Sequence, residues 1–479
     1  MKPFERMKQE LIMWGQRLTL NLLHLVVLLA MLGPGAEVGA EPITLHIPST
    51  TKILPNGLTV VVSPKHKLPM VSISIRFKAG SVNDPEDKAG LAAMTVRLLD
   101  KGTTQRTTLA IADELDFLGA RLEANAGGTG STISFTVLAK DVERGLDLFA
   151  DLLQHAHFDA EELERERAQM LSEIHQQRAE PDEVVAQLFR ETLYADHPLH
   201  RPVSGYANTV PRITQEDVVA FHQRFYVPNN AIVVMVGALP EERMLEVIQR
   251  YFGAWPARPL ESMTFPQPAP TTGKQVCLVN MDVNQSYLQW GHLSVRRADP
   301  EFAAIRGMNY ILGGGEFVSR LMGVIREQQG LAYAVDSEFV GGSRFPGFFS
   351  AELQTAIPTT AQALKSMFAV IESMQQAPVT SEELSDMKRY YEGSLPGRAE
   401  TYEQVTELLI DREFFGLPDG YWEAEMRQIQ QLTGEDIQRL AQRYLDINNF
   451  VLALVSNRED LDLAAAPIPA EAVREVPAP

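Results

Sequence analysis

The side chains that could bind a metal ion are the first candidates for chemistry in this sequence. Two pairs of histidines lie close together in the chain, His155 with His157 and His197 with His200. A catalytic zinc ion needs about three protein ligands, and neither pair has a carboxylate or a third imidazole at a clear ligand spacing. We therefore interpret these histidines as surface or packing residues.

Motifs for nucleophilic catalysis and for phosphate binding are also missing. The sequence has no G-x-S-x-G motif, and its single cysteine, Cys277, has no activating neighbours and no partner for a disulfide. The glycine run 313–315 is not followed by the Gly-Lys-[Ser/Thr] of a phosphate-binding loop. These observations argue against a serine hydrolase, a cysteine hydrolase or a nucleotide-binding protein. Cys277 is expected to be a small buried residue.

The composition is that of a globular protein with room for two or three hydrophobic cores. Of the 479 residues, 45% are hydrophobic and 22% are charged. The formal net charge of −19 argues against binding to free nucleic acid. The same charge suits a soluble protein, and it leaves open a preference for cationic peptides.

Residues 1–40 have the pattern of a signal peptide. Basic residues precede an apolar stretch over 18–32, and Val38-Gly39-Ala40 offers small residues at a cleavage position. The stretch is shorter than the ~20 residues that a membrane-spanning helix needs. We expect export to the periplasm. The alternative is that residues 18–32 are retained as a membrane anchor.

The chain consists of two related halves, and their helices and strands must position any functional site. Residues 213–237 align with residues 432–456 at an offset of 219, and eight of the 25 pairs are identical. In each copy a threonine can cap a helix that begins with Glu-Asp, and an apolar strand follows Asn-Asn. Residues 161–163 match residues 382–384 at an offset of 221. Similar offsets in distant segments indicate a duplicated domain of roughly 200 residues.

Within each half, strands come before helices, which indicates an α+β fold. In the first half the patterns predict strands over 58–63, 70–78 and 131–139 and helices over 141–154 and 160–178. The second half repeats the scheme, with strands near 275–281, 286–294, 331–340 and 347–355 and then helices to residue 445. We expect two homologous domains, each a mostly antiparallel sheet with helices packed on one face.

Composition sets the expected boundaries of these domains. A Pro-rich stretch over 255–273 is expected to be an extended linker between an N-terminal domain, 45–254, and a C-terminal domain, 274–460. The tail over 461–479, rich in Ala, Pro and Glu, is expected to be disordered.

Several short motifs occur in a distinctive order along the chain. They are Asn56-Gly57-Leu58-Thr59-Val60, Lys78-Ala79-Gly80-Ser81, Ala89-Gly90-Leu91-Ala92, Lys101-Gly102-Thr103, Tyr226-Val227-Pro228-Asn229-Asn230, Ser319-Arg320-Leu321 and Gly330-Leu331-Ala332-Tyr333. Over roughly residues 45–460, their order and spacing resemble the pitrilysin and insulinase family of zinc peptidases, which includes the mitochondrial processing peptidases. The resemblance implies that the two domains together form one half of a clamshell.

Active members of that family carry an H-x-x-E-H motif on a helix between the Gly-Leu-Ala and Lys-Gly-Thr motifs. Residues i, i+3 and i+4 share a helix face, so two histidines can hold zinc while the glutamate polarises its water. By resemblance, the corresponding positions here are Ala93, Val96 and Arg97. Alanine and valine offer no donor atom, and arginine stays protonated. We therefore expect this chain to bind no metal and to have no catalytic zinc site of its own.

Active relatives take a third zinc ligand from a glutamate further along the chain, and by resemblance Glu173 stands at that place. A single carboxylate cannot hold a catalytic zinc ion. Our hypothesis is that Arg97 occupies the vacated metal position and pairs with Glu173, because a cation would then replace a cation beside the same anion. The alternative is that Glu173 is a solvated helix residue.

The second half keeps Arg326 and Tyr333, an arginine and a tyrosine with the spacing found in active relatives. By resemblance, Tyr333 would donate a hydrogen bond to the developing oxyanion, and Arg326 would hold a carbonyl of the peptide backbone. The alternative is a structural pair, with Arg326 capping its helix and Tyr333 packing in a strand.

Loss of the zinc residues beside an intact arginine–tyrosine pair suggests a division of labour. The resemblance implies a non-catalytic subunit of a heteromeric zinc endopeptidase, which supplies substrate-binding and oxyanion-stabilising residues to a partner with an intact H-x-x-E-H motif. Zinc is expected in that partner, and unfolded peptides are the expected substrates. The alternative is a proteolytically inactive binding or assembly protein of the same fold. An active peptidase with an unknown site is disfavoured, because no other general base and metal set occurs.

Overall fold

The computed structural model describes residues 45–261 and 263–477. The expected signal peptide, 1–40, and the alternative anchor, 18–32, lie outside the described residues. The described residues form one compact unit. In the described part of the chain, no helix has both the length and the apolar character needed to span a bilayer.

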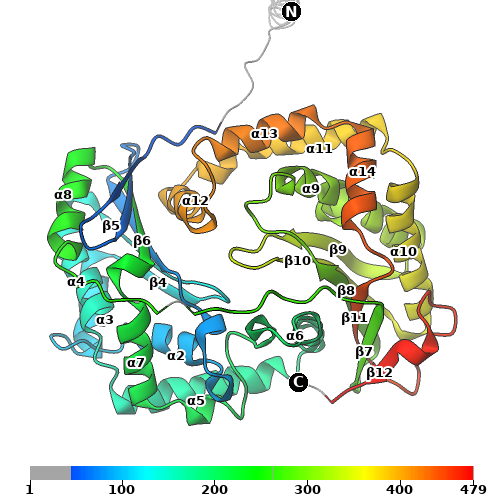
Figure 1. The fold of residues 1–479 in the computed structure, drawn as a ribbon, viewed down its shortest axis with the longest axis horizontal. Helices are drawn as coiled ribbons and strands as arrows, with labels where there is room; N and C mark the ends of the chain where they lie inside the picture. The colour runs from blue at the N-terminus through cyan, green and yellow to red at the C-terminus, as the bar shows by residue number, and fades with distance from the viewer. Residues whose placement is uncertain (1–44, 262, 478–479) are drawn as a thin grey trace, which may run out of the picture. The chain divides into compact units, whose positions relative to one another are not determined.

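Two six-stranded sheets form the framework of this unit (Figure 1). The first, in the order β1-β2-β6-β3-β5-β4, consists of β1 (Thr50–Ile53), β2 (Thr59–Pro64), β3 (Met70–Phe77), β4 (Arg121–Ala126), β5 (Ser131–Leu138) and β6 (Ala231–Gly237). The second, in the order β12-β7-β11-β8-β10-β9, consists of β7 (Lys274–Asn280), β8 (Gln285–Leu293), β9 (Ala332–Val340), β10 (Phe348–Ala356), β11 (Phe450–Ser456) and β12 (Val473–Glu475). Apart from the outermost β1 and β12, the second sheet repeats the first strand for strand. The predicted duplication is therefore visible in the topology.

The sheets are mixed but mostly antiparallel, as expected. The parallel neighbours are β2 with β6, β7 with β11, and β12 with β7. Strands β6 and β11 lie inside their sheets and are buried along their whole length. A strand that is covered on both faces has a continuous apolar sequence, as in the apolar stretch that follows Asn-Asn in each copy.

Helices cover one face of each sheet and form the two main hydrophobic cores. The first sheet is covered by α2 (Leu91–Arg97), α3 (Thr108–Leu118), α4 (Val142–His155), α5 (Ala160–Gln177), α7 (Gln215–Phe225) and α8 (Glu241–Phe252). The second sheet is covered by α9 (Phe302–Asn309), α10 (Thr360–Gln376), α11 (Ser381–Ser394), α13 (Tyr421–Gln431) and α14 (Gly434–Tyr444). The predicted caps of α7 and α14 are confirmed, because Thr214 and Thr433 each form a capping box with an aspartate three residues later.

The opposite face of each sheet is covered by a helix from the other half of the chain, which the sequence did not predict. Helix α12 (Tyr402–Phe415) packs against β2 and β6, and helix α6 (Pro181–Leu193) packs against β7 and β11. The two helices begin 221 residues apart, the offset of the earlier sequence match. They are therefore equivalent elements that the two halves exchange. The exchange buries apolar side chains that a sheet with helices on one face would expose.

Two segments between and after the domains have their own contacts. Between α8 and β7 no described residue is helical or extended in a sheet, but the Phe265 ring packs against Phe345 at 6.0 Å between centroids. The expectation of a disordered tail is corrected: Leu461 and Ile468 are buried in the second core, and β12 pairs with β7. The composition of this segment, rich in Ala, Pro and Glu, suggested disorder. Burial of the two apolar side chains and pairing with the outer edge of β7 order it instead.

Candidate functional site

Helix α2 carries the three positions at which a zinc motif would stand. Ala93, Val96 and four other residues of this short helix are buried. Its N-terminus is held by the buried Asp84, whose carboxylate accepts hydrogen bonds from Gly90 N and Ala92 N, both at 2.9 Å. Burial raises the pKa of Asp84 to about 7, although these backbone hydrogen bonds favour the ionised form. The helix is thus fixed at its start by a side chain.

Arg97 makes the contact that the sequence predicted and a second one that it did not. Its Nη1 donates to Glu173 Oε1 at 3.2 Å, and its Nη2 contacts the other oxygen of the same carboxylate. Nη1 also lies 3.5 Å from Oε2 of Glu166, a buried carboxylate that Lys101 approaches to the same distance. Glu166 and Glu173 are seven residues apart on α5, so they share one helix face. That spacing was the signal that could have identified Glu166.

The charges around Arg97 do not suit a catalytic zinc ion. Burial works against ionisation of Glu173, but hydrogen bonds from Arg97 and Gln169 outweigh it and lower the pKa of this carboxyl. Ala93 and Val96 supply no donor atom, and the guanidinium holds the carboxylate that a metal would need. Elsewhere in residues 45–261 and 263–477, no three His, Cys, Asp or Glu side chains are grouped as metal ligands.

A pocket of about 540 Å³ lies beside Arg97. Residues of α2 form one wall, and residues of β4 around Asn125 and of α6 such as Arg190 form others. Strand β4 ends the first sheet and pairs only with β5 among the described strands. An edge strand of this kind presents backbone N–H and C=O groups to which an extended peptide can add.

Arg326 and Tyr333 lie together on the surface of the second domain. Arg326 lies in a π-helical segment, Met322–Gln328, and its guanidinium stands 5.2 Å from the centre of the Tyr333 ring and 5.3 Å from that of Phe317. Tyr333 is 76% exposed and Phe317 is 61% exposed. Tyr333 lies in β9, as the structural alternative expected, but its side chain is mostly exposed to solvent. Phe317 was missed, although an aromatic residue after a glycine run was its available signal.

The two histidine pairs are surface or packing residues, as interpreted. His155 and His157 are exposed, and His155 Nδ1 lies 3.1 Å from Asp151 Oδ1. His197 is buried against the Phe345 ring at 4.4 Å between centroids, and its carbonyl lies 2.9 Å from His200 Nδ1. Cys277 is buried, as expected.

Comparison with known proteins places the whole arrangement in one family. Residues 59–206 match the family model "Insulinase (Peptidase family M16)", and residues 212–391 match "Peptidase M16 inactive domain". The non-peptidase homolog YmxG of Helicobacter pylori is 25% identical over 84% of this chain and 92% of its own. An uncharacterized zinc protease of Mycobacterium tuberculosis is 28% identical over 85% and 92%, respectively. A crystal structure of a peptidase M16 inactive domain from Pseudomonas fluorescens is 29% identical, covers 85% of this chain and 98% of its own, and has a TM-score of 0.81.

The chain belongs to the M16 peptidase family, that of pitrilysin and insulinase. Its sequence contains no H-x-x-E-H motif.

Proposed function

We propose that this chain is the non-catalytic subunit of a heteromeric zinc endopeptidase. In this proposal Arg326 and Tyr333 act on a peptide held at the zinc site of a partner subunit from the same family. The observation that carries the proposal is an asymmetry between two sites. Arg97 forms ion pairs with Glu173 and Glu166 at the place where the resemblance puts a zinc motif, whereas Arg326 and Tyr333 stay assembled, with the Tyr333 side chain exposed.

The chemistry of the arginine–tyrosine pair supports this role. A phenol hydroxyl donates a hydrogen bond, and a guanidinium remains charged at every physiological pH. Such donors stabilise the negative charge that develops on a carbonyl oxygen during peptide hydrolysis. Neither residue lines the pocket beside Arg97, so the pair has no metal site of its own to serve among the described residues.

The first domain supports a contribution to peptide binding. The outer edge of β4 runs along the pocket beside Arg97, and this edge can pair with an extended, unfolded peptide. The partner would bind the zinc. On the pattern of residues 1–40, we also propose that the complex works in the periplasm.

Coexpression with a family member that has an intact H-x-x-E-H motif tests the proposal. Peptide cleavage by the purified complex should fall by roughly 10²–10³ in kcat when Tyr333→Phe or Arg326→Ala is introduced into this chain. Arg427→Ala and Tyr251→Phe are the controls, because they change the same residue types elsewhere. Size-exclusion chromatography should show that every variant still forms the complex.

Unchanged rates in an intact complex would refute the shared site. That result would favour the alternative, a binding or assembly protein without a proteolytic role. A complex that never forms with any zinc-competent family member of the same organism would refute the proposed partnership itself.

A further inference from the structure

A second cluster of charged residues lies in the second domain, away from both sites described above. Three arginines converge on the buried Glu425 of α13. Arg306 Nη1 donates to Oε1 at 2.7 Å, and Arg398 Nη1 donates to Oε2 at 3.1 Å. Arg297 Nη2 lies 3.5 Å from Oε1. One carboxylate therefore faces three guanidinium groups.

The charges in this cluster do not balance. Burial opposes ionisation of Glu425, but the three arginines lower the pKa of its carboxyl below the ordinary value. In the described part of the chain, Glu425 is the only acidic residue that forms an ion pair with any of these arginines. Two positive charges remain without an anion. Aromatic rings stabilise part of this excess positive charge, because Arg398 lies over the ring of Trp422 and Arg306 over the ring of Tyr391. The three arginine side chains are partly buried, and a charge that is withdrawn from water normally has an anionic partner.

A pocket of about 440 Å³ adjoins the uncompensated charge. Arg306 and Arg398 both line it, together with Asn309, Tyr310, Tyr390 and Ser394. Among described residues, each arginine donates a hydrogen bond through Nη1 alone and to Glu425 alone. Their other N–H groups are thus free to bind an oxyanion on the pocket side. Nothing in the proposed function uses this pocket.

The remaining wall narrows the class of ligand. The Tyr310 and Tyr390 rings stack with 4.6 Å between centroids, and half of Tyr390 is exposed, which offers an aromatic surface. Glu338 also lines the pocket. Its carboxylate would repel a dianion more strongly than a ligand with a single negative charge. We propose that this pocket binds the carboxylate of a small monoanionic ligand whose aromatic or apolar group packs on the tyrosines.

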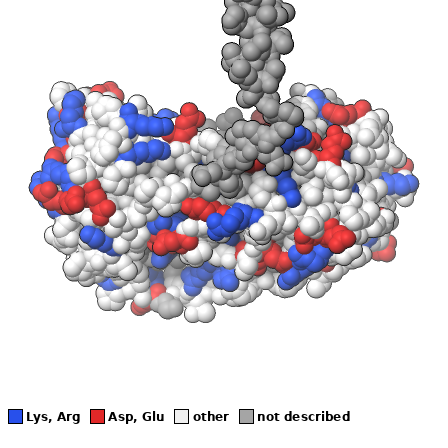
Figure 2. All heavy atoms as spheres, turned by 90° about the horizontal axis from the view of Figure 1, so that it is seen from above, with Lys and Arg blue, Asp and Glu red and all other residues white. Residues whose placement is uncertain are grey.

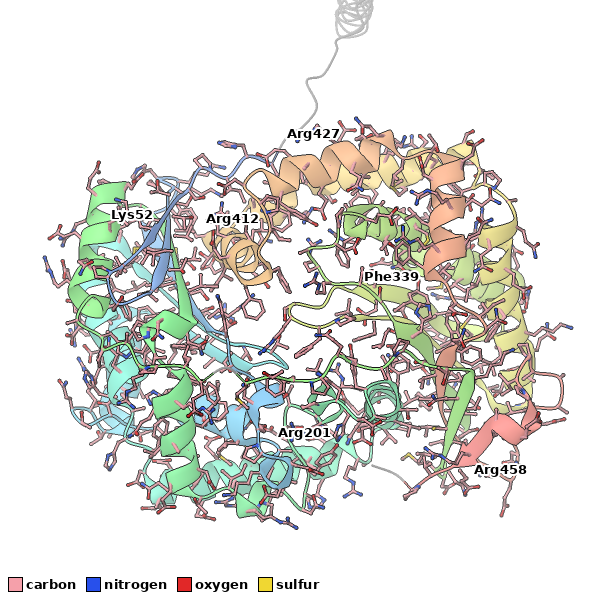
Figure 3. The ribbon with its side chains drawn as sticks, in the orientation of Figure 1. Lys52, Arg201, Phe339, Arg412, Arg427 and Arg458 are labelled. Carbon is pink, nitrogen blue, oxygen red and sulfur yellow. The ribbon has the colours of Figure 1, made fainter. Side chains whose placement is uncertain are left out.

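Calorimetric titration of the purified protein without a partner subunit tests this site. The probes are N-acetyl-L-phenylalanine, its amide and inorganic phosphate. We expect the acid to bind, and the amide and phosphate to bind at least tenfold more weakly. Arg398→Gln should weaken binding of the acid at least tenfold, because a charge-assisted hydrogen bond is lost. Arg427→Gln is the matched control, since Arg427 lies on the outer side of α13 (Figure 3).

Several results would overturn the proposal. They are equal binding of acid and amide, equal binding of acid and phosphate, no binding of the acid, or full affinity in a folded Arg398→Gln variant. If Arg398→Gln does not fold, Tyr390→Ala decides, because that ring is half exposed and can be removed without unpairing Glu425. Full affinity for the acid in this variant would also refute the site. Since no partner is present, these outcomes are independent of the proposed function.

Discussion

At Arg97, a fixed positive charge lies between helices α2 and α5. The guanidinium contacts Glu166 and Glu173 at once, so both carboxylates keep a cationic neighbour. An unpaired carboxylate at this partly buried place would be costly. On our interpretation that Arg97 stands where the resemblance puts a zinc motif, its ion pairs keep the two helices joined without a metal ion.

This interpretation predicts that zinc binding can be restored. A variant with Ala93→His and Arg97→His should bind one equivalent of zinc, since two imidazoles four residues apart on α2 would face Glu173. Isothermal titration with zinc measures it, and the native chain should bind none at this place. The combination Ala93→His with Arg97→Gln supplies one ligand fewer and should bind at least tenfold more weakly. A folded double-histidine variant that binds no zinc would contradict the assigned geometry.

Glu352, on β10, gives a prediction for pH. Burial raises the pKa of Glu352 to about 7, and the charges of Asp336, Glu338 and Asp182 add to the effect. Between the ordinary pKa of a glutamate and about pH 7, Glu352 therefore keeps its proton in the folded state and loses it in the unfolded state. Because the folded state binds more protons than the unfolded state in this range, the free energy of unfolding declines as the pH rises from 4–5 towards 7.

Replacing Glu352 with Gln removes this titration. Between pH 5 and pH 8, the free energy of unfolding should fall by on the order of 1 kcal/mol less in Glu352→Gln than in the native chain, an estimate reduced for partial exposure. Urea denaturation at the two pH values measures it. Glu327→Gln, an exposed glutamate on another element, should behave as the native chain does. Identical pH slopes for all three proteins would argue against the buried carboxyl.

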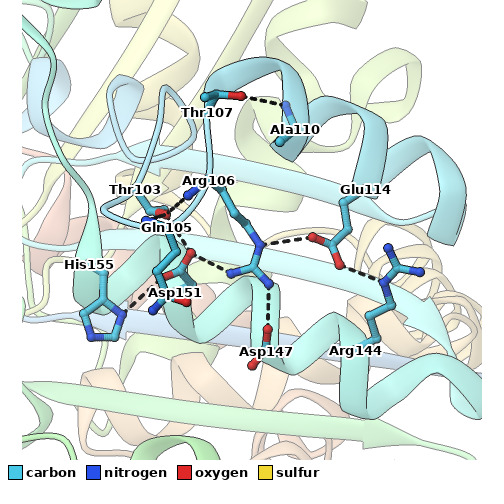
Figure 4. A network of polar contacts seen from close by, with 10 residues as sticks. All are labelled: Thr103, Gln105, Arg106, Thr107, Ala110, Glu114, Arg144, Asp147, Asp151 and His155. Carbon is cyan, nitrogen blue, oxygen red and sulfur yellow. Dashed lines mark hydrogen bonds and ion pairs between the residues drawn. The ribbon is translucent and has the colours of Figure 1, made fainter.

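At the scale of elements, an ion-pair network joins the turn after α2 to α3 and α4 (Figure 4). Arg106 donates to Glu114 of α3 at 3.0 Å and to Asp147 and Asp151 of α4 at 2.6 and 2.7 Å. Asp151 is buried, and its Oδ2 also accepts from Thr103 Oγ1 at 2.7 Å. The network fixes the Lys-Gly-Thr turn, and with it the end of the helix that carries Arg97.

Loss of Arg106 should therefore destabilise the first domain. Arg106→Ala is expected to lower the free energy of unfolding by about 2–3 kcal/mol, because it leaves the buried Asp151 without its cation. Denaturant unfolding followed by circular dichroism measures the change. Arg165→Ala on α5 is the control, since Arg165 pairs with glutamates on an exposed surface and should change stability little. A loss no larger than that of the control would show that the network contributes no stability.

At the scale of the whole unit, the exchange of α6 and α12 makes the two domains depend on each other. Leu409 of α12 is buried against Val234 and Val236 of the first sheet. Charged side chains do not form a large patch of one sign on the face shown in Figure 2, where basic and acidic residues are interspersed. Apolar contact therefore links the two halves, and the ion pair of Arg76 with Asp411 of α12 adds to it.

The exchange predicts that the first domain does not fold alone. A fragment of residues 45–254 should aggregate or stay unfolded, because the sheet face under α12 would be exposed to water. Adding residues 395–417 as a separate peptide should recover part of the native circular dichroism. In the full chain, Leu409→Ala should cost about 2–4 kcal/mol and Leu109→Ala, an exposed leucine on α3, far less. A monomeric fragment with cooperative unfolding would refute this dependence.

The sequence by itself determined the duplication, most of the strands along the chain and the absence of an H-x-x-E-H motif. Each rests on local information: the period of apolar residues, the repeat of a capped helix before a strand, and the identity of three side chains on one helix turn. A missing donor atom cannot be restored by folding, so Ala93 and Val96 could be judged without a structure. The contact of Arg97 with Glu173 also followed, because opposite charges stood at positions that the resemblance brought together.

Only the tertiary structure decided which distant segments meet. The exchange of α6 and α12 could not be predicted from the sequence. The pattern of an amphipathic helix shows that one face is buried, but it does not show which sheet covers that face. The three arginines around Glu425 lie 27 to 128 residues from it, and no local period relates them. The buried tail was hidden for the same reason: Leu461 and Ile468 are isolated apolar residues whose burial depends on a core built by other parts of the chain.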